Sequence, residues 1–399
     1  MPDLSEIKKS LPVAPLGLVV LDSAKTLGND IDRHIGEVRK TEEYKFSGDP
    51  AITGCVKDSY LIKAKCPRFG SGEGKGVFEE SIRGKDIFIL LDVCNYSITY
   101  RMNGIVNHMS PDDHYQDLKR VISAASGIAR RINVIMPFLY EGRQHKRSKR
   151  ESLDCAFMLE ELYNMGIDNF ITFDAHDPRV ANAIPLYGFD NYMLPDQFVN
   201  AILASEKDLI IDKDHLVVIS PDEGALNRAI YFANVLGVNT GMFYKRRDYT
   251  QVVNGKNPIV AHEFLGDNLD GKDVIIIDDM ISSGESMLDT AKKLKDMNAK
   301  RVYICCTFGL FTNGLAAFDK AFERCYFEKL VTTNLNFLPP DLKERPYFIE
   351  ADMSSLLADI INMMNHDVSM SNVNETVEDI HEAIARYNNR EFMELEEHA

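Results

Sequence analysis

The sequence predicts an α/β protein made of two tandem lobes, each a largely parallel sheet flanked by helices. Short apolar runs alternate with longer segments of helical period, which is the pattern of a parallel sheet covered by helices on both faces. At 399 residues the chain exceeds the usual size of one core, and 45% hydrophobic residues can fill two. The series of elements also runs twice, with a seam near residues 195–202.

Each expected strand is a short apolar run, and each expected helix is a longer segment whose apolar residues recur at helical spacing. The strands are Leu16–Leu21, Asp86–Leu91, Ile132–Met136, Phe170–Phe173, Leu216–Ile219, Val274–Ile277 and Val302–Thr307. The helices are Tyr115–Ser126, Asp154–Met165, Leu226–Leu236, Ser286–Met297 and Met353–Met364.

These elements divide the chain into an N-terminal lobe at 1–198, a C-terminal lobe at 199–350 and a final segment at 351–399. Residues 36–58 are polar with few regular patterns, and we interpret them as an insertion in the first lobe. The final segment is expected to pack back on the N-terminal lobe through a helix, followed by an acidic tail at 371–399. From Val377 the tail predicts one exposed amphipathic helix, with Ile380, Ile384 and Tyr387 at helical spacing.

Charge and composition exclude several classes of protein. A net charge of -16 argues against a general nucleic-acid binder, which neutralises phosphates with a basic surface. The seven cysteines form no CxxC pair, which is typical of reduced thiols in the cytoplasm. The first residues lack the apolar core of a signal peptide, and no apolar stretch approaches the ~18 residues of a membrane span. We therefore expect a cytoplasmic protein that neither spans a membrane nor binds nucleic acid.

The strongest motif is VIIIDDMISSGES, in which an apolar strand leads directly into two acids and a hydroxyl-rich turn. Asp278 and Asp279 fall at the carboxyl end of the strand, where open α/β sheets bind ligands. The turn then enters a helix, whose first N–H groups and positive dipole end suit a phosphate. Two adjacent acids favour sugar hydroxyls or a cation as partners, so the motif predicts a site for a phosphorylated pentose. The alternative is that Asp279 or Ser282 only caps the helix.

This stretch resembles the phosphoribosyl-diphosphate signature of the phosphoribosyltransferases and of the ribose-phosphate diphosphokinase family, also called PRPP synthetases. The resemblance implies that ribose 5-phosphate binds at the acids and the turn. The residues it assigns are Asp278, Asp279, Ser282, Ser283, Gly284, Glu285 and Ser286. The chain departs from the family at two of these, because most members have Asp at position 282 and Gly at position 285.

Two N-terminal segments resemble the nucleotide-binding parts of the synthetases rather than of the transferases. In RFGSGEGKG, Phe69, Ser71 and Glu73 match a family loop that reaches the ATP of a neighbouring subunit. The block EGRQHKRSKR places six basic residues between positions 143 and 150, and Arg143 and Gln144 match the family's Arg-Gln pair for ATP. Read alone, this block would be a solvated basic loop. His145 replaces the Asp usual in the family.

Metal and catalytic residues are also implied by the resemblance. His176, which follows a strand in FITFDAHDPR, and Asp222, in VVISPDEGAL, match the family's metal ligands, for which we expect Mg²⁺. Without the family, His176 would be interpreted as a hydrogen-bonded structural residue, and Asp222 as a helix cap. Lys245 and Arg247 match the catalytic loop and are expected on a mobile, polar excursion before the signature strand.

The expected reaction transfers the β,γ-diphosphoryl group of ATP to the C1 hydroxyl of ribose 5-phosphate, giving 5-phosphoribosyl 1-diphosphate and AMP for nucleotide biosynthesis. Lys245 and Arg247 would neutralise charge that shifts during the transfer. The shared nucleotide loop implies a homo-oligomer, a dimer or a larger assembly such as a hexamer. Asp352 stands where phosphate-activated members place an allosteric Ser, which predicts weak or absent activation by phosphate. Two alternatives stay open: a catalytically silent homologue that regulates a true synthetase, and a phosphoribosyltransferase that makes a nucleotide.

Overall fold

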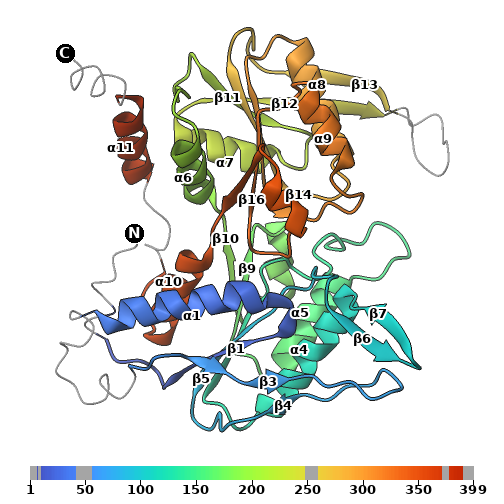
Figure 1. Cartoon of the computed structure of the whole chain (residues 1–399), viewed down its shortest axis with the longest axis vertical. Helices are drawn as coiled ribbons and strands as arrows, with labels where there is room; N and C mark the ends of the chain where they lie inside the picture. The colour runs from blue at the N-terminus through green and yellow to red at the C-terminus, as the bar shows by residue number, and fades with distance from the viewer. Residues whose placement is uncertain (1–6, 8–9, 42–55, 248–258, 371–376, 390–399) are drawn as a thin grey trace. The chain divides into compact units, whose positions relative to one another are not determined.

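Two sheets, one in each half of the chain, organise the protein (Figure 1). The computed structural model describes residues 7, 10–41, 56–247, 259–370 and 377–389. The chain separates into two compact units. The first holds Met1–Leu194, Asn334–Phe337 and Asp352–Asn374, and the second holds Pro195–Thr333, Leu338–Ala351 and Glu375–Ala399.

The first unit contains a six-stranded parallel sheet in the order β10-β9-β8-β5-β1-β2. Its strands are β1 (Leu16–Val20), β2 (Leu61–Ile62), β5 (Asp86–Leu90), β8 (Arg131–Ile135), β9 (Asn169–Phe173) and β10 (Gly188–Tyr192). Its helices are α1 (Lys25–Lys40), α4 (Pro111–Ala125), α5 (Asp154–Asn164) and α10 (Ser354–Asn365). Two small antiparallel pairs complete the unit: β3 (Ala64–Lys65) with β4 (Val77–Phe78), and β6 (Thr99–Met102) with β7 (Ile105–His108).

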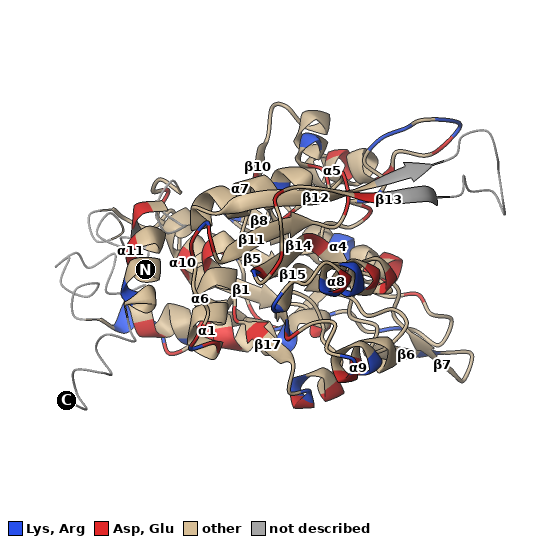
Figure 2. Cartoon of the chain, turned by 90° about the horizontal axis from the view of Figure 1, so that it is seen from above, with Lys and Arg blue, Asp and Glu red and all other residues tan. Residues whose placement is uncertain are grey.

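The second unit contains a seven-stranded sheet in the order β13-β12-β11-β14-β15-β16-β17, parallel except for the β12–β13 pair. Its strands are β11 (Leu216–Ser220), β12 (Asn239–Arg247), β13 (Ile259–Leu265), β14 (Asp273–Ile281), β15 (Val302–Gly309), β16 (Lys329–Thr333) and β17 (Phe348–Ala351). Its helices are α6 (Pro195–Ser205), α7 (Leu226–Leu236), α8 (Glu285–Asp296), α9 (Ala316–Glu323) and α11 (Val377–Asn388). Much of the ribbon of the central strands is tan in Figure 2, as expected for strands that are apolar on both faces.

The two sheets repeat one plan, down to the residues that start their central strands. β1, β5, β8, β9 and β10 follow one another across the first sheet as β11, β14, β15, β16 and β17 do across the second. The sequence Gly-Lys-Asp opens both β5 and β14. In each case the buried Asp pairs with an Arg at, or directly before, the start of the neighbouring strand in the sheet. Asp86 pairs with Arg131 and Asp273 with Arg301, both at 2.7 Å. The duplicated α/β lobes predicted from the sequence are therefore confirmed.

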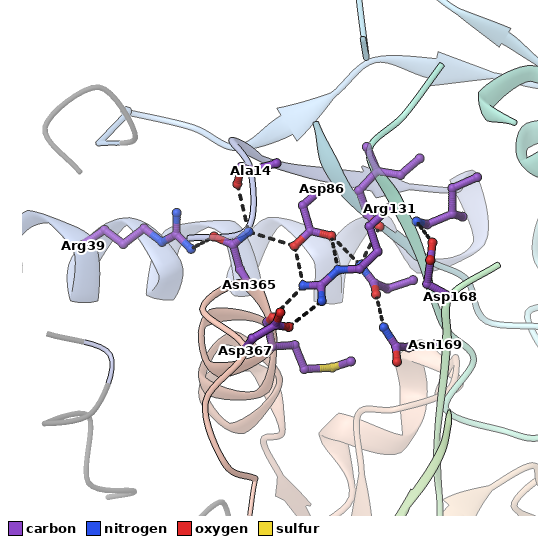
Figure 3. A network of polar contacts seen from close by, with 12 residues as sticks. Ala14, Arg39, Asp86, Arg131, Asp168, Asn169, Asn365 and Asp367 are labelled. Atoms are coloured by element: carbon purple, nitrogen blue, oxygen red, sulfur yellow. Dashed lines mark hydrogen bonds and ion pairs between the residues drawn. The ribbon is translucent and has the colours of Figure 1, made fainter. Parts of the chain in front are cut away.

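Helix α10 completes the first unit although it lies near the end of the chain (Figure 3). Arg131 binds Asp86 on β5 and also donates 2.6 Å hydrogen bonds to Asp367 and to the Met364 carbonyl. Asn365 donates to Asp86 at 2.8 Å and accepts from Arg39 of α1 at 2.7 Å. Side chains of α10 and its end therefore satisfy the buried Asp86 of the central strand.

Three expectations about secondary structure are corrected. Residues 36–40 are not irregular, because α1 runs to Lys40 and buries Ile31 and Ile35; residues 42–55 lie outside the described residues. Lys245–Arg247 do not lie in an excursion but end β12, where β13 pairs with them. The helix α11 forms where expected but is not simply exposed, since Ile380, Ile384 and Tyr387 are at most 8% exposed.

The C-terminal segment is divided between the two units. Residues 352–374 cluster with the first unit and the segment containing α11 with the second. In the second unit the Tyr387 hydroxyl donates to the Glu206 carbonyl. The Asn388 side chain accepts from the Ile211 N–H and donates to the Ile211 carbonyl. Among the helices that the structure describes, none has the length and apolar character to cross a bilayer.

Candidate functional site

Strand β14 carries the two acids of the strongest motif to its carboxyl end. The strand is apolar and buried from Val274 to Ile277, so Asp278 and Asp279 are its first polar residues after Asp273. The Asp279 N–H donates to the Asp278 carboxylate at 2.9 Å. Burial and the neighbouring charge of Asp279 raise the pKa of Asp278 well above its ordinary value, and the nearby Arg228 acts against this shift. A ligand that donates hydrogen bonds or brings positive charge would favour the ionised form here.

The turn after these acids is held tightly by the second unit. The Leu310 N–H donates to the Ile281 carbonyl and the Thr312 N–H to the Ser282 carbonyl, both at 2.9 Å. Gly284 has φ +84°, and a Cβ there would lie 2.3 Å from Cζ of the buried Phe318. Only glycine fits this conformation without displacing the aromatic ring. The turn therefore presents a fixed backbone at the start of α8.

The side chains of the turn lie around the start of α8, where the Ser283 hydroxyl accepts the Glu285 N–H at 3.4 Å. Gly284 is the N-cap of α8 and no side chain caps the helix, so the capping alternative for Asp279 and Ser282 is wrong. Ser282 and Ser283 are half-buried, while Ser286 and Glu285 are exposed in the first turn. The first N–H groups of α8 can bind an anion there.

Helix α7 and the turn before it add two charged residues to the second unit's site. Asp222 follows β11, is half-buried, and accepts the Gly224 N–H at 3.0 Å. It does not cap α7, whose N-cap is Ala225 without a side-chain bond. The Arg228 guanidinium lies 3.5 Å from the Asp278 carboxylate, with its side chain only 10% exposed. Arg228 was not among the predicted site residues; its only signal was a cation on the helix that follows Asp222.

The predicted nucleotide residues lie in the first unit on two separate loops. Residues 68–74, here called the Phe69 loop, expose the Phe69 ring by 55%, and Ser71 donates to Glu73 at 2.8 Å. Arg143 is exposed in the loop after β8. Gln144 is half-buried and donates to the Ser152 carbonyl at 2.6 Å. Phe69 and Arg143 thus present an aromatic face and a cation to solvent.

His176 is exposed after β9 and lies beside His145, which pairs with Asp177, a residue that was not predicted as part of the site. Its ring is 5.5 Å from that of His145, measured between centroids. His145 Nε2 lies 3.3 Å from the Asp177 carboxylate. Hydrogen bonding from Arg179 is the main cause that lowers the pKa of Asp177 to about 2. His145, which departs from the family, and Arg179 therefore both contact one carboxylate, that of Asp177.

Lys245 and Arg247 have backbones at the end of β12, paired with His262 and Ile259 of β13. Their side chains lie outside what the structure describes, as do residues 248–258. Their predicted catalytic role stays a prediction.

The donor atoms suit a hard cation that arrives with substrate phosphates. Mg²⁺ is commonly held in such sites by one or two carboxylates, with phosphates and waters completing the shell. Asp222 offers carboxylate oxygens in the second unit, and the first unit carries His176 with an exposed ring. Within the described ranges no group of three or more His, Cys, Asp or Glu is arranged as a metal site. Each residue, taken by itself, is a donor that suits a metal held mainly by substrate phosphates.

Comparison with known proteins covers both units. Residues 16–166 match the family model for the N-terminal domain of ribose phosphate pyrophosphokinase, and residues 197–330 match the phosphoribosyl transferase domain. A ribose-phosphate pyrophosphokinase from Clostridium perfringens is 31% identical over 320 residues, which cover 78% of this chain and 89% of the relative. The chain belongs to the ribose-phosphate pyrophosphokinase family.

Further similarities agree with this assignment. A ribose-phosphate pyrophosphokinase from Corynebacterium glutamicum is 29% identical over 77% of this chain and 86% of its own. The solved structure of phosphoribosylpyrophosphate synthetase from Mycobacterium smegmatis superposes with a TM-score of 0.69 at 22% identity, covering 88% of this chain and 99% of that one. The family and the fold class predicted from the sequence are confirmed.

Proposed function

We propose that this chain is an active ribose-phosphate diphosphokinase that transfers the β,γ-diphosphoryl group of ATP to the C1 hydroxyl of ribose 5-phosphate. The products would be 5-phosphoribosyl 1-diphosphate and AMP. The observation that carries the proposal is the Asp278–Asp279 pair at the carboxyl end of β14, followed by the Gly284 turn. It lies inside the stretch that matches the phosphoribosyl transferase domain.

The second unit would bind the sugar phosphate. The 5-phosphate would accept hydrogen bonds from the first N–H groups of α8 and from the hydroxyls of Ser283 and Ser286. The ribose hydroxyls would donate to Asp278 and Asp279, and these hydrogen bonds would favour the ionised form of Asp278 against the burial that raises its pKa. Arg228 supports the same charge state from 3.5 Å. Glu285 is exposed, so its departure from the family still leaves the backbone N–H groups for the phosphate.

The first unit would bind the nucleotide. Phe69 offers a stacking face for adenine, and Arg143 a planar cation for phosphate or base. Glu73 would accept hydrogen bonds from the sugar or base, and Ser71 would donate or accept them. Gln144 would bind the sugar or base after release from Ser152. Lys245 and Arg247 would neutralise the charge that develops on the transferred group, which is the main contribution of protein side chains to phosphoryl transfer.

The family generally uses a divalent metal, and Mg²⁺ is the ion we propose for this chain. When bound, it would bridge phosphate oxygens and reduce the repulsion that faces the attacking hydroxyl. His176 and Asp222 are the residues that would hold it. We further propose a cytoplasmic homo-oligomer, at least a dimer, in which the exposed Phe69 loop serves the nucleotide of a neighbouring subunit.

The test is formation of AMP by the purified protein with ATP, Mg²⁺ and ribose 5-phosphate. Wild-type protein should release AMP only when ribose 5-phosphate is present, and Lys245→Ala should lose about 10²–10³ in rate by removing one charge-stabilising group. Lys320→Ala, an exposed lysine on α9, is the matched control and should keep full activity.

Two other outcomes would overturn the proposal. If wild type and Lys245→Ala both release no AMP, the chain is the silent homologue, and the departures at positions 282 and 285 would be the first residues to restore. If a nucleobase and phosphoribosyl diphosphate give a nucleotide instead, the chain is a phosphoribosyltransferase.

A further inference from the structure

The β6–β7 hairpin contacts the Phe69 loop through alternate residues of one strand and through its turn. Thr99 and Arg101 of β6 are exposed, whereas Tyr100 and Met102 are half-buried. Successive side chains of a strand point to opposite faces, so Tyr100 and Met102 share one face. The Tyr100 ring lies 5.0 Å from the Arg68 guanidinium, and Met102 packs on Gly72, where an added Cβ would be 2.8 Å from Sδ.

The turn of the hairpin supplies a backbone hydrogen bond to the same loop. Asn103 and Gly104 have φ of 49° and 78°, which is the pattern of a two-residue type I′ turn. The Asn103 N–H donates to the Gly70 carbonyl at 2.9 Å. Three residues of the hairpin therefore contact the Phe69 loop: Tyr100 contacts Arg68, Met102 contacts Gly72, and Asn103 bonds Gly70.

The Phe69 loop is closed on itself and anchored on its other side by α4. Arg68 and Gly74 form an isolated antiparallel β-bridge, and the Phe69 N–H donates to the Glu73 carbonyl at 2.7 Å. Arg68 also bonds Asp117 of α4 at 3.0 Å. With the hairpin on one side and α4 on the other, the loop backbone is held while the Phe69 ring stays 55% exposed.

The hairpin has few stabilising contacts of its own apart from those with the Phe69 loop. Ile105 and Val106 of β7 are 67% and 51% exposed, so the hairpin buries little apolar surface of its own. An isolated two-stranded hairpin is at best marginally stable in water. Its contacts with the Phe69 loop are therefore a main source of its order.

We propose that the β6–β7 hairpin is a positioning element that pre-orders the Phe69 loop for the nucleotide, with Tyr100 and Met102 as its positioning residues. The inference rests on the proposed function, in which Phe69 contacts ATP. A loop already held in its binding conformation loses less entropy when the ligand arrives, so the hairpin raises ATP affinity without touching ATP. It acts on nucleotide binding and leaves ribose 5-phosphate binding unaffected.

A fluorescent reporter of the loop can be made because the chain contains no tryptophan. Phe69→Trp introduces a single tryptophan, which can be excited selectively over the 16 tyrosines, and keeps an aromatic face. In this background, Tyr100→Ala and Met102→Ala should lower the time-resolved anisotropy of Trp fluorescence. The same variants in the wild-type background should weaken ATP binding about three- to tenfold by calorimetry without ribose 5-phosphate. The kcat at saturating ATP and the KM for ribose 5-phosphate should stay within about twofold, since the loop is re-ordered once ATP is bound.

Three controls keep the test specific. Val106→Ala removes a side chain that pairs across from Arg101 on the other face of the hairpin, and it should change neither anisotropy nor ATP affinity. Tyr100→Phe and Met102→Leu keep the packing and should restore wild-type behaviour. Thermal unfolding identifies any variant that fails to fold.

The outcomes separate this inference from the proposed function. Unchanged anisotropy in Tyr100→Ala and Met102→Ala, or a looser loop with unchanged ATP affinity, overturns the positioning role. If ATP affinity depends on the hairpin but wild type forms no AMP with ribose 5-phosphate, the proposed reaction fails and the positioning role stands. If wild type does not bind ATP, both fail.

Discussion

Replacing Gly284 by alanine tests whether the backbone of the signature turn is fixed by packing as well as by its φ. Alanine at φ +84° costs about 1–2 kcal/mol in the left-handed region. The new Cβ would also meet Cζ and Cε2 of Phe318 at 2.3 and 2.5 Å. Phe318 is fully buried against Phe311, with ring centroids 5.3 Å apart, so it cannot swing away freely. Overpacking of this kind costs about 1–3 kcal/mol, which gives a total loss of about 2–5 kcal/mol in the free energy of unfolding.

The assay is urea denaturation followed by circular dichroism, together with calorimetric binding of ribose 5-phosphate. Gly271→Ala is the matched control, because Gly271 has φ +73° but nothing within 4 Å of an added Cβ. It should lose only the conformational cost of about 1–2 kcal/mol and bind the sugar phosphate normally. If Gly284→Ala loses no more stability than Gly271→Ala, the contact with Phe318 does not fix the turn. If it binds ribose 5-phosphate as well as wild type, the turn is not the phosphate site.

Three further predictions concern pH, a buried ion pair and regulation. Burial raises the pKa of Asp92 from 3.8 to about 7, so the folded state holds this proton more tightly than the unfolded chain. The free energy of unfolding should therefore fall by up to about 4 kcal/mol as the pH rises from about 4 to 7. In urea titrations Asp92→Asn should remove this part of the pH dependence, and a variant with the same dependence as wild type would contradict the prediction. Arg131→Met leaves the fully buried Asp86 without its cation and should lower the free energy of unfolding by about 3–5 kcal/mol in the same titrations. The control Arg345→Met breaks a more exposed pair with Asp319 and should lower it far less. Equal losses in the two variants would refute the prediction. Inorganic phosphate should not stimulate AMP formation, because the Asp352 carboxylate, which accepts a 2.7 Å hydrogen bond from Asn334, would repel an anion. Strong stimulation of AMP formation by added phosphate would refute this prediction.

The central strands could be predicted because they are buried on both faces and read as continuous apolar runs. Val274–Ile277 is such a run, and β14 follows it. The edge strands could not be predicted in this way. β10 has the sequence GFDNY and β17 the sequence FIEA, and both are only half-buried for most of their length. Their order depends on pairing with a neighbour rather than on their own composition.

Helix α1 and the hairpin were missed for different reasons. The glycine at position 28 argues against a helix, yet a Cβ there would lie 2.5 Å from Val20, so glycine is what allows α1 to approach β1. The hairpin did carry a readable signal, since the Asn103-Gly104 dipeptide between apolar residues is typical of a type I′ turn.

The acids and the turn of the site followed from the motif because they are contiguous in sequence. The Arg228–Asp278 and His145–Asp177 pairs join residues from different elements, so only the fold brings them together.

The first unit is built from segments that are far apart in the sequence, and this limits how the protein can be divided into fragments or folded during synthesis. The first unit takes its α10 from residues 354–365, after most of the second unit has been translated. A fragment ending at Leu194 would lack Asn365 and Asp367, so Asp86 would lose the hydrogen bond from Asn365, and Arg131 would lose its acceptor on Asp367. The N-terminal half therefore cannot reach its final fold while it emerges from the ribosome. It must wait for α10, and any attempt to produce this half alone should supply that helix with it.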